Sequence, residues 1–122
     1  MVTFTLMVCT EPYKFEGIDS MIEIGKALLR KGHLIKGVFF YGSGVYNLKS
    51  GIETGSDTRN IPEKLAEFCN GNDIPMIGCT TWVGLAGLKE PDFIGGSGED
   101  GLGALSNWTW ESDKLLVFGT GS

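Results

Sequence analysis

The chain has 122 residues, of which 42% are hydrophobic and 20% charged, a balance typical of an ordered globular protein rather than a disordered one. Its net charge is −5 at pH 7, with ten Lys and Arg against fifteen Asp and Glu. This acidic balance argues against direct binding to nucleic acid or to an anionic membrane surface, since both usually require a basic face. The length predicts a single domain over residues 1–122.

Three cysteines, Cys9, Cys69 and Cys79, stand at irregular spacing. An odd number of cysteines without a CxxC or Cys/His pattern predicts neither a disulfide framework nor a metal site. We therefore expect no bound metal and a reducing compartment, the cytoplasm. The opening segment is apolar for only about nine residues, which is too short for a secretory signal or a membrane span. It predicts a first strand instead.

Hydrophobic periodicity and turn residues predict strands and helices that alternate along the chain. Ile18, Met21 and Ile22 share one face at helical spacing, and Gly32 stands where that helix should end. Asn60 is the expected N-cap of a second helix. The expected order is strand 3–10, helix 17–33, strand 33–41, polar glycine-rich loop 42–59, helix 60–71, strand 74–79, loop 80–100, helix 101–114 and strand 114–119.

This alternation predicts an α/β fold, a three-layer α/β/α domain around a small, mostly parallel sheet. In such sheets, binding and catalytic sites lie outside the carboxyl ends of the strands. Segment 10–17, the loop that starts at Tyr41, and Cys79 all fall at that edge. Loop 42–59 is long for a compact domain, and loops of that length are usually functional or mobile.

Cys79 closes the apolar stretch "IPMIGC" and is followed by "TTWVGLAG", which can form a short helix. Backbone N–H groups of Thr80, Thr81 and Trp82 would then point at the sulfur and stabilise a thiolate. An alternative of equal weight is a structural cysteine that fills the end of the strand. For Cys9, and equally for Cys69 in the second predicted helix, the preferred interpretation is a small buried hydrophobic residue without a chemical role.

The only histidine, His33, begins the second predicted strand and therefore lies at the opposite edge of the sheet from Cys79. A Cys–His nucleophile is not expected, because the two side chains would have to meet across the domain. The chemistry that remains needs only thiolate character and access, namely thiol exchange or carriage of a persulfide sulfur.

Two glycine-rich stretches are weak motifs. Gly96, Gly98 and Gly101 form G-x-G-x-x-G, but no strand is expected before them, and the intervening Glu99 and Asp100 would repel a pyrophosphate. The stretch "YGSGVYN" lacks the GK[ST] ending of a P-loop. We therefore expect neither a dinucleotide nor any other organic cofactor.

Trp108 and Trp110 lie two positions apart in the last predicted helix. Residues at that spacing cannot both face the core. We therefore expect one of the two to be exposed, as tryptophans at interfaces are.

The opening 48 residues, with "KGHLIKGVFFYGSGVYNL", and the later stretch "GLGALSNWTWESDKLLVFG" together resemble the DsrE/TusD family of small sulfur-carrier proteins. The resemblance implies a DsrE-like, flavodoxin/Rossmann-like fold and a cytoplasmic sulfurtransferase without cofactors. It implies that Cys79 takes sulfur as a persulfide and passes it to a partner's cysteine. It also implies trimers or hexamers, homo- or hetero-oligomeric, that serve tRNA thiolation or sulfur oxidation without touching nucleic acid. Bulky Trp82 and the segment 49–60 depart from the family's pattern and leave the partner open.

Three interpretations follow. The main one is a sulfurtransferase in which Cys79 is the nucleophile, the amides of Thr80, Thr81 and Trp82 stabilise its anion, and loop 42–59 shapes access. A second is a structural subunit of a similar complex, in which Cys79 is never loaded. A third is a small-ligand binding module that uses the glycine-rich loops. Cys9 lies at the same sheet edge and is a less favoured candidate for resolving Cys79.

Overall fold

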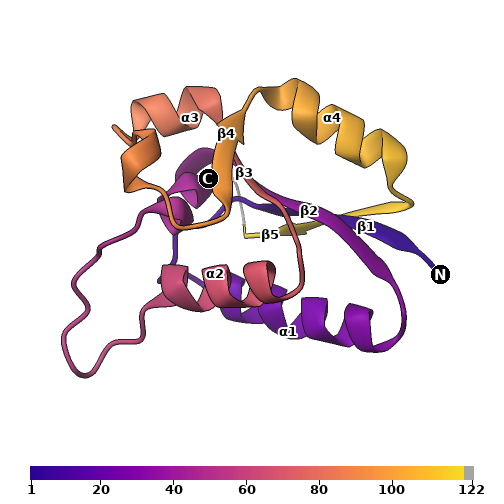
Figure 1. Ribbon diagram of the computed structural model, residues 1–122, viewed down its shortest axis with the longest axis horizontal. Helices are drawn as coiled ribbons and strands as arrows, with labels where there is room; N and C mark the ends of the chain where they lie inside the picture. Colours follow the sequence, from indigo (N-terminus) through magenta and orange to yellow (C-terminus); the bar gives the residue numbers. More distant parts are fainter. Residues whose placement is uncertain (120–122) are drawn as a thin grey trace.

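A computed structural model describes residues 1–119 of the chain. Five strands form one sheet in the order β4-β3-β2-β1-β5, and every neighbouring pair is parallel (Figure 1). The predicted parallel α/β architecture is confirmed. The elements are β1 (Thr3–Val8), α1 (Gly17–Arg30), β2 (Leu34–Phe40), the 3-10 helix η1 (Gly42–Leu48), α2 (Ile61–Gly71), β3 (Met76–Cys79), α3 (Thr80–Leu85), the 3-10 helix η2 (Glu90–Asp92), β4 (Ser97–Asp100), α4 (Leu102–Glu111) and β5 (Lys114–Phe118).

Helices cover both faces of the sheet and give three layers (Figure 1). Helices α1 and α2 lie on one face, and α3 and α4 lie on the other. The chain moves from β1 through β2 and β3 to β4 in one direction, and then crosses back to place β5 beside β1. Because crossovers between parallel strands are right-handed, the reversed connection carries α4 to the face opposite α1 and α2.

The core lies between the sheet and the pair α1 and α2. The predicted apolar face of α1 is confirmed, since Ile18, Met21 and Ile22 are buried against the sheet. Helix α2 begins where the sequence predicts, because the Asn60 side chain accepts a hydrogen bond from the Glu63 N–H at 3.1 Å. Both helices therefore bury one side and hold the strand ends in fixed positions.

Two parts of the chain differ from the sequence prediction. Segment 97–100, predicted as loop, is the edge strand β4 and pairs with β3. Its sequence, "SGED", lacks the β-branched and aromatic residues by which strands are recognised, so only its pairing defines it. Residues 42–48, predicted as irregular loop, form η1, which buries Val45 and Leu48.

The last helix, α4, is held over β1 and β2 by one tryptophan. The Trp108 ring packs on Gly37 so closely that a Cβ atom there would lie 2.5 Å from the ring. Trp110, two residues later, is 90% exposed. The prediction that one of these two tryptophans is exposed is confirmed.

Candidate functional site

Cys79 lies at the carboxyl end of β3, where the sheet meets α3. It is the last residue of the strand and the N-cap of the helix, with extended backbone angles (φ −67°, ψ 122°). Its side chain is buried, with 3% of its surface exposed. Cys79 therefore lies at the sheet edge that the sequence predicts. The residues around it determine whether a reagent can reach its thiol.

The three residues predicted to bind with Cys79 form the first turn of α3. Thr80 and Thr81 are exposed, and Trp82 is at the border of exposure. Within the described residues, no backbone N–H of this turn donates a capping hydrogen bond to the Cys79 side chain. The sulfur of the resting thiol therefore sits at the start of α3 without a direct amide contact.

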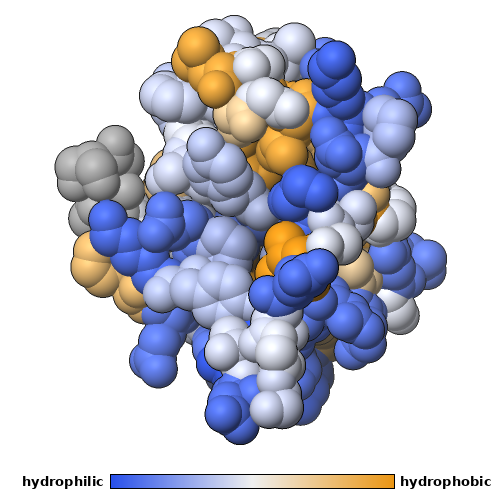
Figure 2. All heavy atoms as spheres, turned by 90° about the vertical axis from the view of Figure 1, so that its left-hand side faces the viewer, coloured by the Kyte–Doolittle hydropathy of each residue, from blue (hydrophilic) through white to orange (hydrophobic). Residues whose placement is uncertain are grey.

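Two aromatic side chains and η1 surround the start of α3. The Tyr41 ring meets the Trp82 ring edge to face, with centroids 5.8 Å apart. A hollow of about 110 Å³ lies between η1 and α3 and is lined by Gly42, Ser43, Val45, Tyr46, Trp82, Leu85 and Ala86. Figure 2 faces this side of the molecule and shows hydrophobic surface mainly in its upper half, above a largely hydrophilic lower half. Cys79 does not line this hollow, but Trp82, three residues after it in the chain, does.

η1 is fixed to the end of β1 by Asn47, whose side chain is fully buried. Its amide group donates to the Thr10 carbonyl at 2.8 Å and to the Gly44 carbonyl at 2.9 Å. Gly44 packs directly on the Val8 carbonyl, where a Cβ atom would collide. Residues 42–48 of loop 42–59 are thus held in a fixed conformation beside the site.

The other two cysteines are less suited to thiolate chemistry. Burial raises the pKa of the Cys9 thiol, and it raises the pKa of the Cys69 thiol to about 12. Both are buried and unpaired, as predicted. A raised pKa keeps each thiol protonated and weakly nucleophilic near neutral pH.

Cys9 is also badly placed to resolve Cys79. Val8, Phe40 and Gly78 lie side by side in β1, β2 and β3, and each cysteine directly follows the outer members of this row. Adjacent strands are about 4.8 Å apart, so two spacings separate the cysteines by about 10 Å. A disulfide needs Cα atoms within about 7 Å, so this pair cannot form one without backbone movement.

His33 lies far from the cysteine, as the sequence predicts. It directly precedes β2, and its Nδ1 atom accepts a hydrogen bond from the Val2 N–H at 3.0 Å. Cys79 lies beyond the other end of β2, so about seven residues of strand, or roughly 20 Å, separate the two side chains. The His33 imidazole therefore binds the backbone at the amino-terminal edge of the sheet, away from Cys79.

Asp100 is a neighbour of Cys79 that the sequence prediction missed. The two residues pair across β3 and β4, and the Asp100 carboxylate accepts a hydrogen bond from the Gly101 N–H at 2.7 Å. The pairing follows from β4, which was predicted as loop. Neither the identity nor the spacing of Asp100 in the sequence signals this position.

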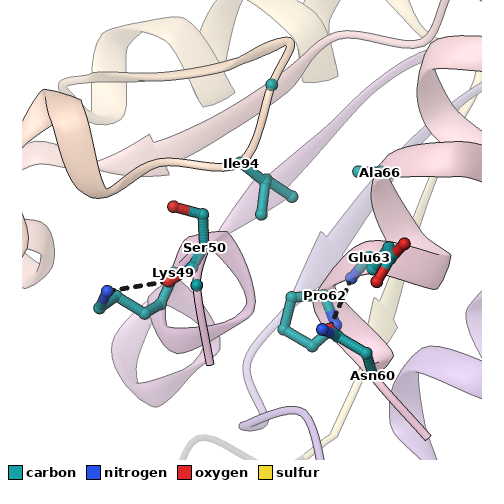
Figure 3. A pocket seen from close by; sticks show the side chains of 9 residues that line it. Lys49, Ser50, Asn60, Pro62, Glu63, Ala66 and Ile94 are labelled. Atoms are coloured by element: carbon teal, nitrogen blue, oxygen red, sulfur yellow. Dashed lines mark hydrogen bonds between the residues drawn. The ribbon is translucent and has the colours of Figure 1, made fainter. Parts of the chain in front are cut away.

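A second hollow, of about 270 Å³, lies beside α2 and includes none of the predicted site residues (Figure 3). The side chains of Ile94 and Pro62 point into it. Several polar groups on its rim already have partners within the chain: Lys49 Nζ donates to the Ser50 carbonyl, Ser50 Oγ donates to the Asp92 carbonyl, and Asn60 caps α2. This hollow therefore offers few free polar groups to orient a small ligand.

Among residues 1–119, no three His, Cys, Asp or Glu side chains cluster in a way that could hold a metal ion. Within the same described part of the chain, every helix is too short or too polar to cross a membrane.

Comparison with known proteins gives consistent relatives over nearly the whole chain. A family model described as the DsrE/DsrF-like family matches residues 3–118. The protein named sulfurtransferase DsrE from Allochromatium vinosum is 31% identical over 127 aligned residues, covering 95% of this chain and 98% of that protein. Sulfurtransferase TusD from Cronobacter sakazakii is 27% identical, covering 94% and 98%. These relatives support a role in sulfur transfer in general.

Among solved structures, the crystal structure of the YchN protein from E. coli superposes with a TM-score of 0.82 at 20% identity, covering 97% of this chain and 100% of that one. At this level of identity the likeness concerns the fold. It agrees with the predicted DsrE-like architecture.

Proposed function

Because this chain belongs to the DsrE/DsrF-like family, we propose that it is a sulfurtransferase that carries sulfane sulfur as a persulfide on Cys79. The observation that carries the proposal is the position of this thiol. It ends β3 at the carboxyl edge of the sheet and is followed at once by α3 and its apolar hollow. All three cysteines are buried, so it is this position rather than exposure that makes Cys79 the candidate nucleophile.

The proposed reaction has two displacement steps. The Cys79 thiolate attacks the outer sulfur of a donor persulfide or polysulfide, a sulfur–sulfur bond forms to Cys79, and the donor leaves as a thiolate. An acceptor thiolate then attacks the outer sulfur, and the Cys79 thiolate leaves. Each step conserves electrons, because one sulfur–sulfur bond breaks as another forms. No metal or organic cofactor is needed.

Thr80, Thr81 and Trp82 are proposed to support the anion and its access. A persulfide extends about 2 Å beyond the thiol sulfur, so its charge occupies a place that the resting thiol does not fill. Backbone N–H groups at the start of α3 are suited to such an anion. Trp82, packed on Tyr41, would control how the donor and the acceptor reach it.

We further propose that the chain works in the cytoplasm and passes sulfur to other sulfur-carrier proteins, as a homo- or hetero-oligomer of trimeric or hexameric kind. The relatives named TusD and the three free cysteines support this setting. We propose that residues 1–122 form one DsrE-like domain, which the match over residues 3–118 supports.

One observation favours a second candidate, a structural subunit in which Cys79 is never loaded. Only 3% of the Cys79 surface is exposed, and a thiol must be reached by its donor to react. The two candidates differ in one measurable property, the labile sulfur on Cys79.

The test is to incubate the purified protein with polysulfide or thiosulfate and to measure intact and peptide masses with and without reductant. We expect one reducible extra sulfur on the peptide that holds Cys79. It should be absent in Cys79→Ala and present in the matched controls Cys9→Ala and Cys69→Ala. An unmodified Cys79 in folded protein, beside a control carrier that does load, would establish the structural candidate instead.

A Trp82→Ala variant sharpens the same test. If the ring controls access, its removal should speed alkylation of Cys79 by a small reagent, while Ile24→Ala, at an exposed position on α1 outside the hollow, should leave the rate unchanged. Equal rates in all three proteins would show that Trp82 does not limit access.

A further inference from the structure

A carboxylate lies beside Cys79 at the carboxyl edge of the sheet. Cys79 ends β3, and the residue that pairs with it in the neighbouring strand β4 is Asp100. β4 is an edge strand of the sheet and leads directly into α4 (Figure 1). Paired residues in adjacent strands have Cα atoms about 4.8 Å apart. Strand pairing therefore brings the charged side chain of Asp100 next to the candidate nucleophile.

A glycine of β4 shows that paired residues of these two strands share a face of the sheet. Gly98 pairs with Ile77, and a Cβ atom on Gly98 would lie 3.9 Å from the Ile77 side chain. Successive side chains along a strand alternate between the two faces. The pair two residues further on, Cys79 and Asp100, therefore lies on that same face. The thiol and the carboxylate are thus neighbours on one side of the sheet.

The Asp100 carboxylate is exposed and held in place by the backbone. Its Oδ1 atom accepts a hydrogen bond from the Gly101 N–H at 2.7 Å, and the residue is exposed to solvent. Among residues 1–119, no basic side chain forms an ion pair with it. The charge of this carboxylate is therefore not neutralised by another side chain of the described part of the chain.

The segment between Cys79 and Asp100 is itself acidic. Residues 80–100 contain one basic residue, Lys89, and four acidic residues, Glu90, Asp92, Glu99 and Asp100. Within the described residues none of these four carboxylates is in an ion pair. Interactions between exposed charges extend over about a Debye length, roughly 10 Å at 0.1 M salt. An anion that approaches Cys79 is therefore repelled, and a cation is attracted.

This charge bears on sulfur transfer because sulfur donors and acceptors differ in charge. Polysulfide and thiosulfate are small anions whose charge nothing else compensates. A cysteine on another protein also reacts as an anion, but basic side chains around it can make its surroundings positive. Complementary charges speed encounter and suppress wrong partners. An acidic rim beside Cys79 thus suits a protein partner with a basic rim better than it suits a small anion.

We propose that Asp100 is a specificity-determining residue for the Cys79 thiol. Its carboxylate slows small anionic reagents and favours partner proteins whose reacting cysteine is flanked by Lys or Arg side chains. Asp100 forms no bond in the reaction and acts through its charge. This role rests on the proposed function, since it takes Cys79 as the thiol that receives sulfur, and it adds the residue that selects the partner and the charge that the partner carries.

The test compares how fast two methanethiosulfonates of opposite charge, the sulfonatoethyl anion and the trimethylammonioethyl cation, modify Cys79 in the full chain. In both reactions the Cys79 thiolate attacks the sulfenyl sulfur, a disulfide forms and methanesulfinate leaves. Peptide masses report Cys79 separately from the other cysteines. We expect Asp100→Asn, which keeps the shape of the side chain, to lower the cation-to-anion rate ratio by about tenfold.

Glu99→Gln is the matched control. Glu99 is also exposed and carries the same charge, but it pairs with Gly78 and so lies on the other face of the sheet. Its ratio should change by less than about twofold, and Asp100→Glu should behave like wild type. Raising the salt to about 1 M should lower the wild-type ratio without any substitution. A change in the openness or ionisation of Cys79 would alter both rates alike and leave the ratio unchanged.

An unchanged ratio in Asp100→Asn or an equal fall in Glu99→Gln would overturn the role of Asp100. So would a Cys79 that neither reagent modifies in the folded protein, because there would be no access to select. These rates do not require sulfur to be carried. Sulfur loading on Cys79 with an unchanged ratio would overturn the role of Asp100 alone. A lowered ratio on a Cys79 that never loads would overturn the proposed function and leave selection by charge in place.

Discussion

The two faces of the sheet are covered in very different ways. On one face, α1 and α2 bury ten residues completely or nearly so against the strands, Gly17, Ile18, Met21, Ile22 and Gly25 from α1 and Ile61, Pro62, Leu65, Phe68 and Cys69 from α2. On the other face, α3 buries only Val83, and no residue of α4 is buried. Hydrophobic burial, and with it stability, is therefore concentrated on one side.

The face covered by α3 and α4 carries the candidate functional site. Cys79 lies where α3 begins, and α4 in the same layer leaves Leu102 and Trp110 exposed. The contrast indicates that substitutions of buried residues on the first face should lower the free energy of unfolding more than substitutions on the second face.

The strongest way to break this contrast is Leu65→Ala in α2. Leu65 is fully buried, so its truncation should lower the free energy of unfolding by about 2–5 kcal/mol through lost burial and a new cavity. Leu85→Ala in α3, at a site 71% exposed, is the control and should change it by about 0.5 kcal/mol or less. Urea denaturation measures both, and equal losses would contradict the contrast between the faces.

A smaller effect is expected from Gly37→Ala, which disturbs the seat of α4. The new methyl would lie 2.5 Å from the Trp108 ring, so the ring must move, at a cost of about 1–3 kcal/mol. Gly103→Ala, in α4 itself with open space around it, is the matched control and should not destabilise. Urea midpoints and tryptophan fluorescence report the two changes. A Gly37→Ala protein as stable as wild type would mean that α4 is free to shift.

The smallest effect is expected at Asp19, which ties the end of loop 42–59 to α1. Hydrogen bonds from Arg59 and Lys64 lower the pKa of its carboxyl to about 2. A carboxyl with a depressed pKa stabilises the fold above its unfolded pKa of about 4, and this contribution is lost as the pH falls through about 2.

Asp19→Asn should therefore cost about 1 kcal/mol or less near neutral pH, since solvent screens these partly exposed groups. The difference from wild type should shrink below about pH 4. Urea denaturation at several pH values measures it. A difference that stays constant down to about pH 3 would show that the carboxylate charge is not responsible.

Much of the fold could be predicted because its main helices and strands have recognisable patterns in their own sequences. The helix of residues 17–30 has its apolar face in its own sequence, and Asn60 with Pro62 defines the start of α2. β4 could not be predicted, because "SGED" acquires its strand character only from β3 beside it. η1 was missed for a similar reason, since Val45 and Leu48 are buried by contacts with β3 that the sequence does not reveal.

The candidate site shows the same division. The position of Cys79 follows from one local pattern, an apolar strand that ends in a cysteine. Its burial, its pairing with Asp100 and the packing of Tyr41 on Trp82 depend on strand register and on segments far apart in the chain. Local patterns thus locate the thiol, and only the assembled sheet defines its surroundings.

The placement of β5 beside β1 has a consequence for how the protein is made. β1 is synthesised about a hundred residues before one of its two neighbours, residues 114–118, and the Thr3 N–H bonds to Asp113, 110 positions later. Until that segment emerges, β1 has an open, apolar edge, and the sheet cannot close around it. Residues up to Phe118 must therefore be synthesised before the sheet can close, and contacts of such long sequence separation slow folding.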